Sequence, residues 1–140
     1  MRQIKLIWIG CISGVVLGVF LKLTEQMTSK RVYTLLLNVD YIPILKDLPL
    51  NEFGEFMLHM IVSVILVPVI YVALTQIGHQ QNLFTYMLLS SFIGAVIYVT
   101  TSFSERTPDL LDGTSFLLWV IGHVVFGWVT GFLITKIVKD

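Results

Sequence analysis

The chain has 140 residues, of which 56% are hydrophobic and 13% charged, and a mean hydropathy of +0.86. These values exclude an ordinary water-soluble domain and indicate a chain embedded in lipid. The formal net charge is zero and the basic residues are scattered, which argues against a nucleic-acid partner. The single cysteine, Cys11, excludes an internal disulfide and a cysteine cluster for zinc or iron–sulfur.

Four apolar stretches are each long enough to cross a bilayer. They cover residues 6–23, 56–74, 83–101 and 115–135. About 20 predominantly apolar residues span the hydrocarbon core as a helix, and a helix satisfies its own backbone hydrogen bonds there. The sequence therefore predicts an all-α, polytopic membrane protein with four transmembrane helices, folded as a single domain over residues 1–140. The short polar connector of residues 76–82 predicts a tight helical hairpin between the second and third spans.

The connector between the first two spans, residues 24–55, contains a further helical pattern. Apolar residues recur there at helical spacing, at Val32, Leu35, Leu36, Val39 and Ile42. Pro43 and Pro49 interrupt the pattern. This predicts a short amphipathic segment that either lies in the membrane interface or dips into the bundle.

Nearly all acidic residues fall on one side of the predicted membrane. They are Glu25, Asp40, Asp47, Glu52, Glu55, Glu105, Asp109 and Asp112, whereas Asp140 falls on the other side. Four spans place both termini on one side. Lysine and arginine are nearly balanced across the membrane, but the terminal basic residues stand close to the span ends, which favours cytoplasmic termini.

Small and polar residues line one stripe of each span. Gly10, Gly14 and Gly18 repeat every four residues in the first span, and Trp119, His123, Gly127 and Gly131 do so in the fourth. Such stripes let helices approach closely in lipid. We therefore expect His123 and, in the second span, His59 to face the bundle interior. The stripes suit packing within one chain or between chains, so a homo-oligomer or another membrane protein stays open as a partner beside the bilayer.

Ionisable residues near these histidines form a candidate site. It comprises Lys22, Glu25, Arg31, Glu55, His59, Arg106, Asp112 and His123. Ionisable side chains in a membrane are unfavourable unless paired, and they frequently mark function. Glu55 precedes His59 by four residues, so its carboxylate can reach the imidazole or share a ligand with it.

Three interpretations of this cluster compete. It is an internal hydrogen-bond network, a metal or proton site, or a centre for chemistry on lipid head groups. A divalent metal such as zinc or manganese would bind Glu55, His59 and His123. For lipid chemistry, Arg31 or Arg106 would hold a phosphate while a histidine acts as base. Haem between the two histidines is disfavoured, because Glu55 and the charged rim suit a polar site better than an apolar macrocycle.

No catalytic motif accompanies the cluster. HExxH, the P-loop and the GxSxG elbow are all absent from the sequence. The leading hypothesis is a non-enzymatic membrane component whose cluster binds an ion or proton or stabilises a partner interface. The alternative is a small membrane enzyme acting on a lipid or lipid-linked substrate.

One pattern of isolated residues extends over most of the chain. It reads Gly14-x-x-x-Gly18-x-x-x-Lys22-x-x-Glu25, then His59-x-x-x-Ser63, Tyr71, and Gly122-His123 with Trp128. The pattern loosely resembles the YagU-type family of small bacterial inner-membrane proteins. That resemblance implies a bacterial cytoplasmic membrane and supplies no catalytic residues.

Overall fold

The computed structural model describes residues 1–138, and the regular elements in them are all helices. The long helices are α1 (Arg2–Thr28), α3 (Glu52–Gln76), α4 (Leu83–Tyr98) and α5 (Gly113–Ile137). A short helix, α2 (Val32–Leu37), follows α1, and a 3-10 helix, η1 (Val99–Phe103), continues α4. The predicted all-α fold with four spans is confirmed. The expected place of Lys139 and Asp140 beyond the last span lies outside the described residues.

Local sequence signals fix where the helices begin. The Asn51 side chain accepts a hydrogen bond from the backbone of α3, and Asn82 and Asp112 do the same for α4 and α5. Each cap satisfies a backbone N–H that the first helical turn leaves without a partner. At the other end of α1, Ser29 adopts a left-handed conformation with φ 58° and its N–H bonds to Glu25 O, which turns the chain toward α2.

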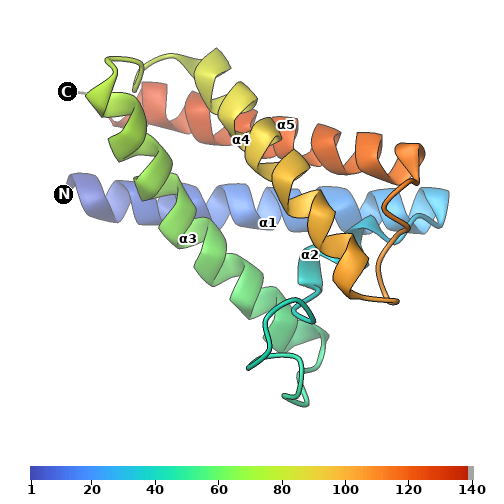
Figure 1. The fold of residues 1–140 in the computed structure, drawn as a ribbon. Coiled ribbons are helices and arrows are strands. Elements are labelled where there is room, and N and C mark those ends of the chain that lie inside the picture. Colours follow the sequence, from blue (N-terminus) through green and yellow to red (C-terminus); the bar gives the residue numbers. More distant parts are fainter. Residues whose placement is uncertain (139–140) are drawn as a thin grey trace.

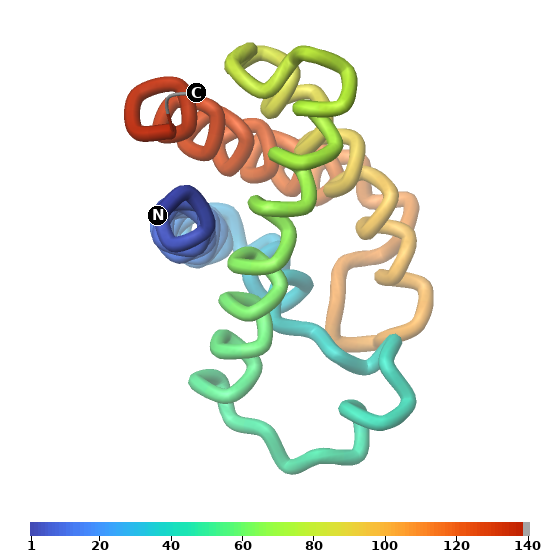
Figure 2. Tube along the Cα trace, turned by 90° about the vertical axis from the view of Figure 1, so that its left-hand side faces the viewer, coloured from blue at the N-terminus to red at the C-terminus, as the bar shows by residue number. Residues whose placement is uncertain are grey.

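The helices pair in an order that the chain connectivity does not suggest. Helices α1 and α5 run antiparallel beside each other, while α3 packs on α1 and α4 packs on α5 (Figure 1). Over residues 1–138, α3 and α4 barely touch, although only a short connector separates them. The tube view shows these two helices diverging away from their connector (Figure 2). The prediction of a tight hairpin is thus right for the connector and wrong for the packing of the two helices.

Close backbone approach explains this pairing. A Cβ at Gly10 of α1 would lie 2.8 Å from Val64 Cα of α3, and one at Gly127 of α5 would lie 2.5 Å from Tyr86 O of α4. Helices in lipid associate through such van der Waals packing, since hydrophobic exclusion does not distinguish a neighbouring helix from acyl chains. Gly10, Gly14 and Gly18 of α1 therefore pack on α3, Gly127 and Gly131 of α5 pack on α4, and little is left to hold α3 against α4.

Helix α2 dips into the bundle, the second of the two placements that the sequence left open. Its Val32 and Leu35 side chains are buried, and the helix packs against α1, α3 and α5. Glu25 of α1 anchors it by accepting hydrogen bonds from Thr34 N at 2.8 Å and from Thr34 Oγ1 at 2.9 Å. The residues after α2 are thereby held beside the interior face of α3.

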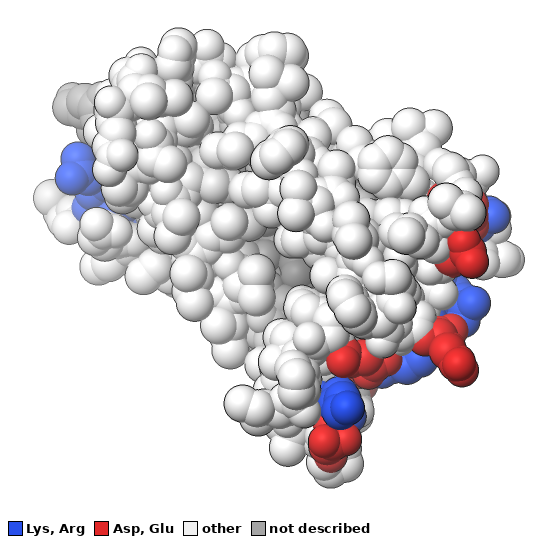
Figure 3. Space-filling model, in the orientation of Figure 1, with Lys and Arg blue, Asp and Glu red and all other residues white. Residues whose placement is uncertain are grey.

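The two ends of the bundle differ in charge. Acidic and basic side chains gather together at one end, and on the same face of the molecule the described charged side chains at the end that holds the termini are basic (Figure 3). Between these ends the helices are long and apolar enough to cross a membrane. The chain is therefore a small integral membrane protein with one densely charged end, which we call the acidic end.

Candidate functional site

Among the described ion pairs, the one with the most buried carboxylate joins Glu55 to Arg106 at the acidic end. Arg106 Nη1 lies 3.0 Å from Glu55 Oε1 and Nη2 lies 3.4 Å from Oε2, so the guanidinium donates a hydrogen bond to each carboxylate oxygen. The Glu55 side chain is only 8% exposed. The hydrogen bond to Glu55 raises the pKa of Arg106 above the ordinary value, so the guanidinium stays protonated. Asp40 lies 3.9 Å from the same guanidinium and accepts a hydrogen bond from Ser104, which fastens both acidic-end loops to α3.

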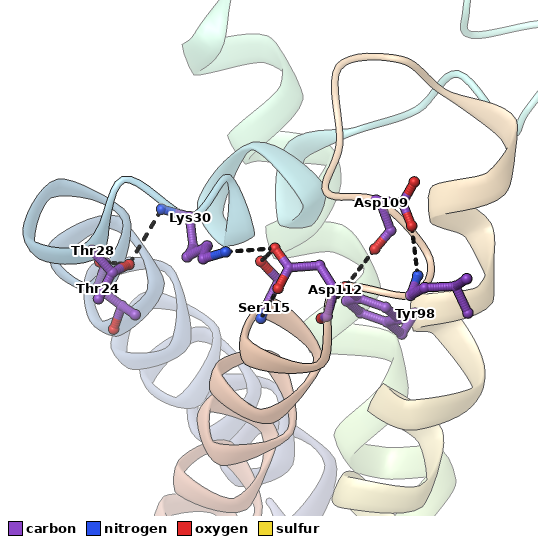
Figure 4. Close-up of polar contacts among 8 residues, drawn as sticks. Thr24, Thr28, Lys30, Tyr98, Asp109, Asp112 and Ser115 are labelled. Atoms are coloured by element: carbon purple, nitrogen blue, oxygen red, sulfur yellow. Dashed lines mark hydrogen bonds and ion pairs between the residues drawn. The ribbon is translucent and has the colours of Figure 1, made fainter.

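A second cluster surrounds the start of α5. Lys30 Nζ lies 2.9 Å from Asp112 Oδ2, and Ser115 Oγ donates to the same oxygen at 2.8 Å (Figure 4). The Lys30 ammonium, followed by the Ser115 hydroxyl, lowers the pKa of Asp112 to about 2. The Tyr98 hydroxyl, close to the backbone oxygens of Asp109 and Asp112, holds the end of α4 to this corner. These contacts fix the loop geometry around Asp112.

Two further residues of the predicted site, Lys22 and Arg31, are exposed on the outside of the acidic end. Lys22 Nζ contacts Glu52 Oε1 at 2.6 Å, and Arg31 Nη1 donates to Glu105 O at 3.1 Å. Lys22, Glu25, Glu52, Glu55 and Arg106 together line a polar surface hollow of about 550 Å³. Three carboxylates face two cations there, so the hollow does not favour an anionic ligand.

A second, largely apolar cavity of about 190 Å³ lies between α3 and α4. Its lining includes Leu66 of α3, Ile93 of α4, Leu17 of α1 and Phe126 of α5. The surface is hollowed between α3 and α4 on the face shown in Figure 3. Because α3 and α4 pack on different partners, this cavity opens sideways, where the acyl chains of a membrane would lie.

His59 and His123 both line this cavity. His59 Nε2 lies 3.0 Å from Gly14 O, and His123 Nδ1 lies 2.9 Å from Trp119 O. A carbonyl only accepts hydrogen bonds, so these ring nitrogens carry the protons. In a neutral ring the other nitrogen, Nδ1 of His59 or Nε2 of His123, then presents a lone pair.

The His123 ring is held tightly in place. A Cβ on Gly94 would lie 2.4 Å from His123 Cγ, so the ring rests directly on the α4 backbone. Trp119 Nε1 donates to Gly94 O at 2.7 Å, and its indole ring contacts the imidazole with centroids 4.5 Å apart. The atoms of the ring nearest to Gly94 are Cγ, Cδ2 and Nδ1, which leaves Nε2 on the far side.

The expected metal set does not assemble. Glu55 binds Arg106, whereas His59 and His123 each give one nitrogen to a backbone carbonyl. Within residues 1–138, no group of three histidine, cysteine or acidic side chains lies close enough to hold a metal ion. Glu55, His59 and His123 all line the cavity, but Arg106 engages the carboxylate, so two imidazoles remain, which is fewer donors than a stable protein metal site uses.

Two polar residues of the cavity did not enter the predicted site. Asn38, just after α2, and Ser90 of α4 are 2% and 1% exposed, and both line the cavity. Asn38 Nδ2 and Ser90 Oγ have no hydrogen-bond partner among the described residues. The sequence offered a signal for each, because an amide stands in an apolar stretch at Asn38 and Ser90 shares the polar stripe of its span.

The fold and the site define a small polytopic integral membrane protein with a cavity that opens within the span region. No protein-family model matches the chain, and neither do curated proteins or solved structures. The geometry of the cavity and of the acidic end is therefore the basis for assigning a function.

Proposed function

We propose that this protein is a non-enzymatic lipid-binding component of a bacterial cytoplasmic membrane, with both termini in the cytoplasm. The lipid places its apolar chain in the cavity between α3 and α4. One observation carries the proposal: a mostly apolar cavity, lined by all four spanning helices, opens sideways between two helices that barely touch. Apolar cavities of comparable volume, roughly 150 Å³, stay free of water and accept small apolar groups.

The mouth of the cavity suits lateral entry from the bilayer. Ile61 and Val62 of α3 line it and are each 55% exposed on the outer, lipid-facing side. An acyl chain reaching these residues remains in apolar surroundings along its whole path. Entry from the acidic end is closed by the Glu55–Arg106 pair, since Glu55 lines both the cavity and the polar hollow.

The acidic end has a structural part in this proposal. Its ion pairs hold the loops across the end of the cavity. This role matches the internal hydrogen-bond network, which is one of the three interpretations of the cluster drawn from the sequence. The pairing of Glu55 with Arg106 supports this assignment over a cation or proton ligand, because the carboxylate is already neutralised.

Binding of a cation is a second candidate, favoured by the two imidazoles that line one cavity. Titration of the purified protein with Zn²⁺ in calorimetry separates the two candidates. Saturable binding that His59→Phe and His123→Phe both abolish would support the cation. No heat of binding is expected if the cavity holds a lipid chain.

Photolabelling tests the lipid proposal directly. The protein is reconstituted in phospholipid vesicles containing a trace of hexadecanol that carries a diazirine on the first carbons of its chain, next to the hydroxyl, and labelled peptides are mapped after illumination. We expect labelling concentrated on the cavity-lining segments of α3 and α4. Labelling spread evenly over every exposed face of the four spans would refute the proposal.

A matched pair of variants on α3 sharpens this test. Val62 and Val69 lie two turns apart on the same helix and are 55% and 57% exposed, but only Val62 lines the cavity. Val62→Trp is expected to fill the mouth and abolish most of the cavity labelling, whereas Val69→Trp leaves it unchanged. Both indoles would face lipid, so neither variant disturbs the buried core. Equal labelling of the two variants would contradict lateral entry.

A further inference from the structure

The cavity that we propose for a lipid chain also contains polar atoms that an alkyl chain alone would leave without partners. Asn38 Nδ2 is a buried donor and Ser90 Oγ a buried hydroxyl, and neither has a hydrogen-bond partner within residues 1–138. Buried polar groups in native proteins are nearly always paired, so an unpaired group beside a cavity points to a ligand that pairs with it. The ligand therefore brings a polar group inside the cavity.

The histidines define the hydrogen-bonding character of that group. His59 and His123 line the cavity and donate to Gly14 O and Trp119 O, so the second nitrogen of each neutral ring carries a lone pair and no proton. The imidazoles need a hydrogen-bond donor and the Asn38 amide needs an acceptor, so the ligand group must donate to an imidazole and accept from Asn38. A hydroxyl does both, because it has one proton and two lone pairs.

Charge and size narrow the ligand further. Apart from the two imidazoles, Glu55 is the only acidic or basic side chain that lines the cavity within residues 1–138, and Arg106 neutralises it, so no lysine or arginine compensates a buried phosphate or carboxylate. The adjoining polar hollow has more carboxylates than cations and offers an anionic head group no better place. A cavity of about 190 Å³ admits a small head group and the first part of one chain, and excludes a two-chain phospholipid head.

We infer that the cavity binds a single-chain membrane alcohol, with its hydroxyl among His59, His123, Ser90 and Asn38 and its chain leaving between α3 and α4 into the bilayer. This inference rests on the proposed function and specifies its ligand. The hydroxyl lies at about one-third of the way along α3, since His59 is the eighth of its 25 residues. The head group of the ligand is thus drawn below the level of the phospholipid head groups.

Competition for photolabelling tests the inference. Unlabelled 1-hexadecanol, hexadecyl methyl ether, palmitic acid and a two-chain phosphatidylcholine are each titrated against the diazirine-bearing hexadecanol in the wild-type protein. The ether matches the chain and keeps the oxygen but has no proton to donate. We expect the alcohol to compete at a concentration about tenfold lower than the ether, which is the effect of one well-formed hydrogen bond.

The outcomes separate the inference from the function on which it rests. Labelling of the cavity with equal competition by alcohol and ether would overturn the hydroxyl assignment and keep the lipid-binding proposal. Stronger competition by palmitic acid or by the phospholipid would also overturn it, in favour of an acidic or a two-chain ligand. Absence of cavity labelling would remove the lipid-binding proposal itself.

Neighbouring serines on α4 provide a matched control. Ser90 lines the cavity with an unpaired hydroxyl, whereas Ser91 lies outside it and donates to Met87 O at 2.6 Å within its own helix. Ser90→Ala is expected to weaken competition by the alcohol several-fold and to leave the ether unaffected. Ser91→Ala should preserve the wild-type preference. If both variants retain the preference for alcohol, we expect Asn38→Leu to abolish it, and retention in all three would refute the hydroxyl position.

Discussion

Gly127 of α5 is the position where a single added methyl group tests the helix packing most directly. A Cβ there would lie 2.5 Å from Tyr86 O and 2.7 Å from Met87 Cα. Both atoms belong to the α4 backbone, so a change of side-chain rotamer cannot relieve the overlap. Carbon atoms make favourable contact at about 3.5–4.0 Å, so Gly127→Ala must move α4 away from α5 by roughly 1 Å.

The expected loss of stability in Gly127→Ala is set by overpacking and lost contacts, which destabilise, and by helix propensity, which stabilises. Overpacking typically lowers stability by about 1–3 kcal/mol, and here the upper part of that range applies because the obstacle is backbone. A separation of roughly 0.5–1 Å also forfeits about a quarter to a half of each neighbouring dispersion contact. Alanine is a better helix former than glycine and offsets about 1 kcal/mol of this loss. We expect Gly127→Ala to lower the free energy of unfolding by about 2 kcal/mol.

The assay is equilibrium unfolding by sodium dodecyl sulfate in dodecyl maltoside micelles, followed by helical circular dichroism. Gly113→Ala is the matched control, because Gly113 lies on the same helix and its Cβ would meet no atom within 4 Å. That variant should be as stable as the wild type or up to about 1 kcal/mol more stable, because it gains helix propensity and meets no obstacle. If Gly127→Ala is as stable as Gly113→Ala, then α4 and α5 do not pack as closely as the structure shows.

Three further predictions use the acidic end and the termini. Arg106→Ala should lower the free energy of unfolding by about 2 kcal/mol, less than for a fully buried pair because the guanidinium is half exposed. The control Arg31→Ala loses only an exposed contact and should lower it by under about 0.5 kcal/mol. Equal losses in the two variants would contradict the special role of Glu55. The Lys30 ammonium holds the pKa of Asp112 at about 2 instead of 3.8, so this stabilisation is full above pH 3.8 and disappears as the pH falls to about 2. Between pH 3.8 and about 2, the free energy of unfolding of Asp112→Asn should therefore fall less steeply than that of the wild type. The same pH dependence in both proteins would refute the stabilising role of the Lys30–Asp112 pair. Reporter fusions to the two termini should report the same side of the membrane, because α1 and α5 place their free ends together; reporters on opposite sides would exclude this bundle.

The spanning helices were predictable because bilayer thickness sets their length and their apolar composition is continuous. Their pairing was not, since it depends on which backbone can approach which. The glycines at positions 10 and 127 were recognised as contact residues from their spacing, but spacing does not name the partner. Gly10 meets α3 and Gly127 meets α4, and this choice leaves α3 and α4 apart despite their short connector.

The candidate site was predictable where contacts are local along the sequence. Spacing placed Glu55 one helical turn before His59 and suggested that the two interact. In the structure a more distant residue, Arg106, takes the carboxylate, because a bidentate hydrogen bond between ionised groups is stronger than one to a neutral ring. Arg106 is 51 residues away in an irregular loop, so only the folded loop reveals the pair.

The same packing that stabilises the bundle also produces the cavity. If α3 and α4 met along their length, their apolar faces would close over His59 and His123, and the histidines would be ordinary buried residues satisfied by backbone carbonyls. Because the two helices dock on α1 and α5 instead, each imidazole is fixed by one carbonyl and lines a shared cavity. The small residues at the two helix interfaces are thus the structural cause of the site. A substitution that forces α4 away from α5 is expected to disturb ligand binding through the position of the His123 ring, even though it touches no ligand atom.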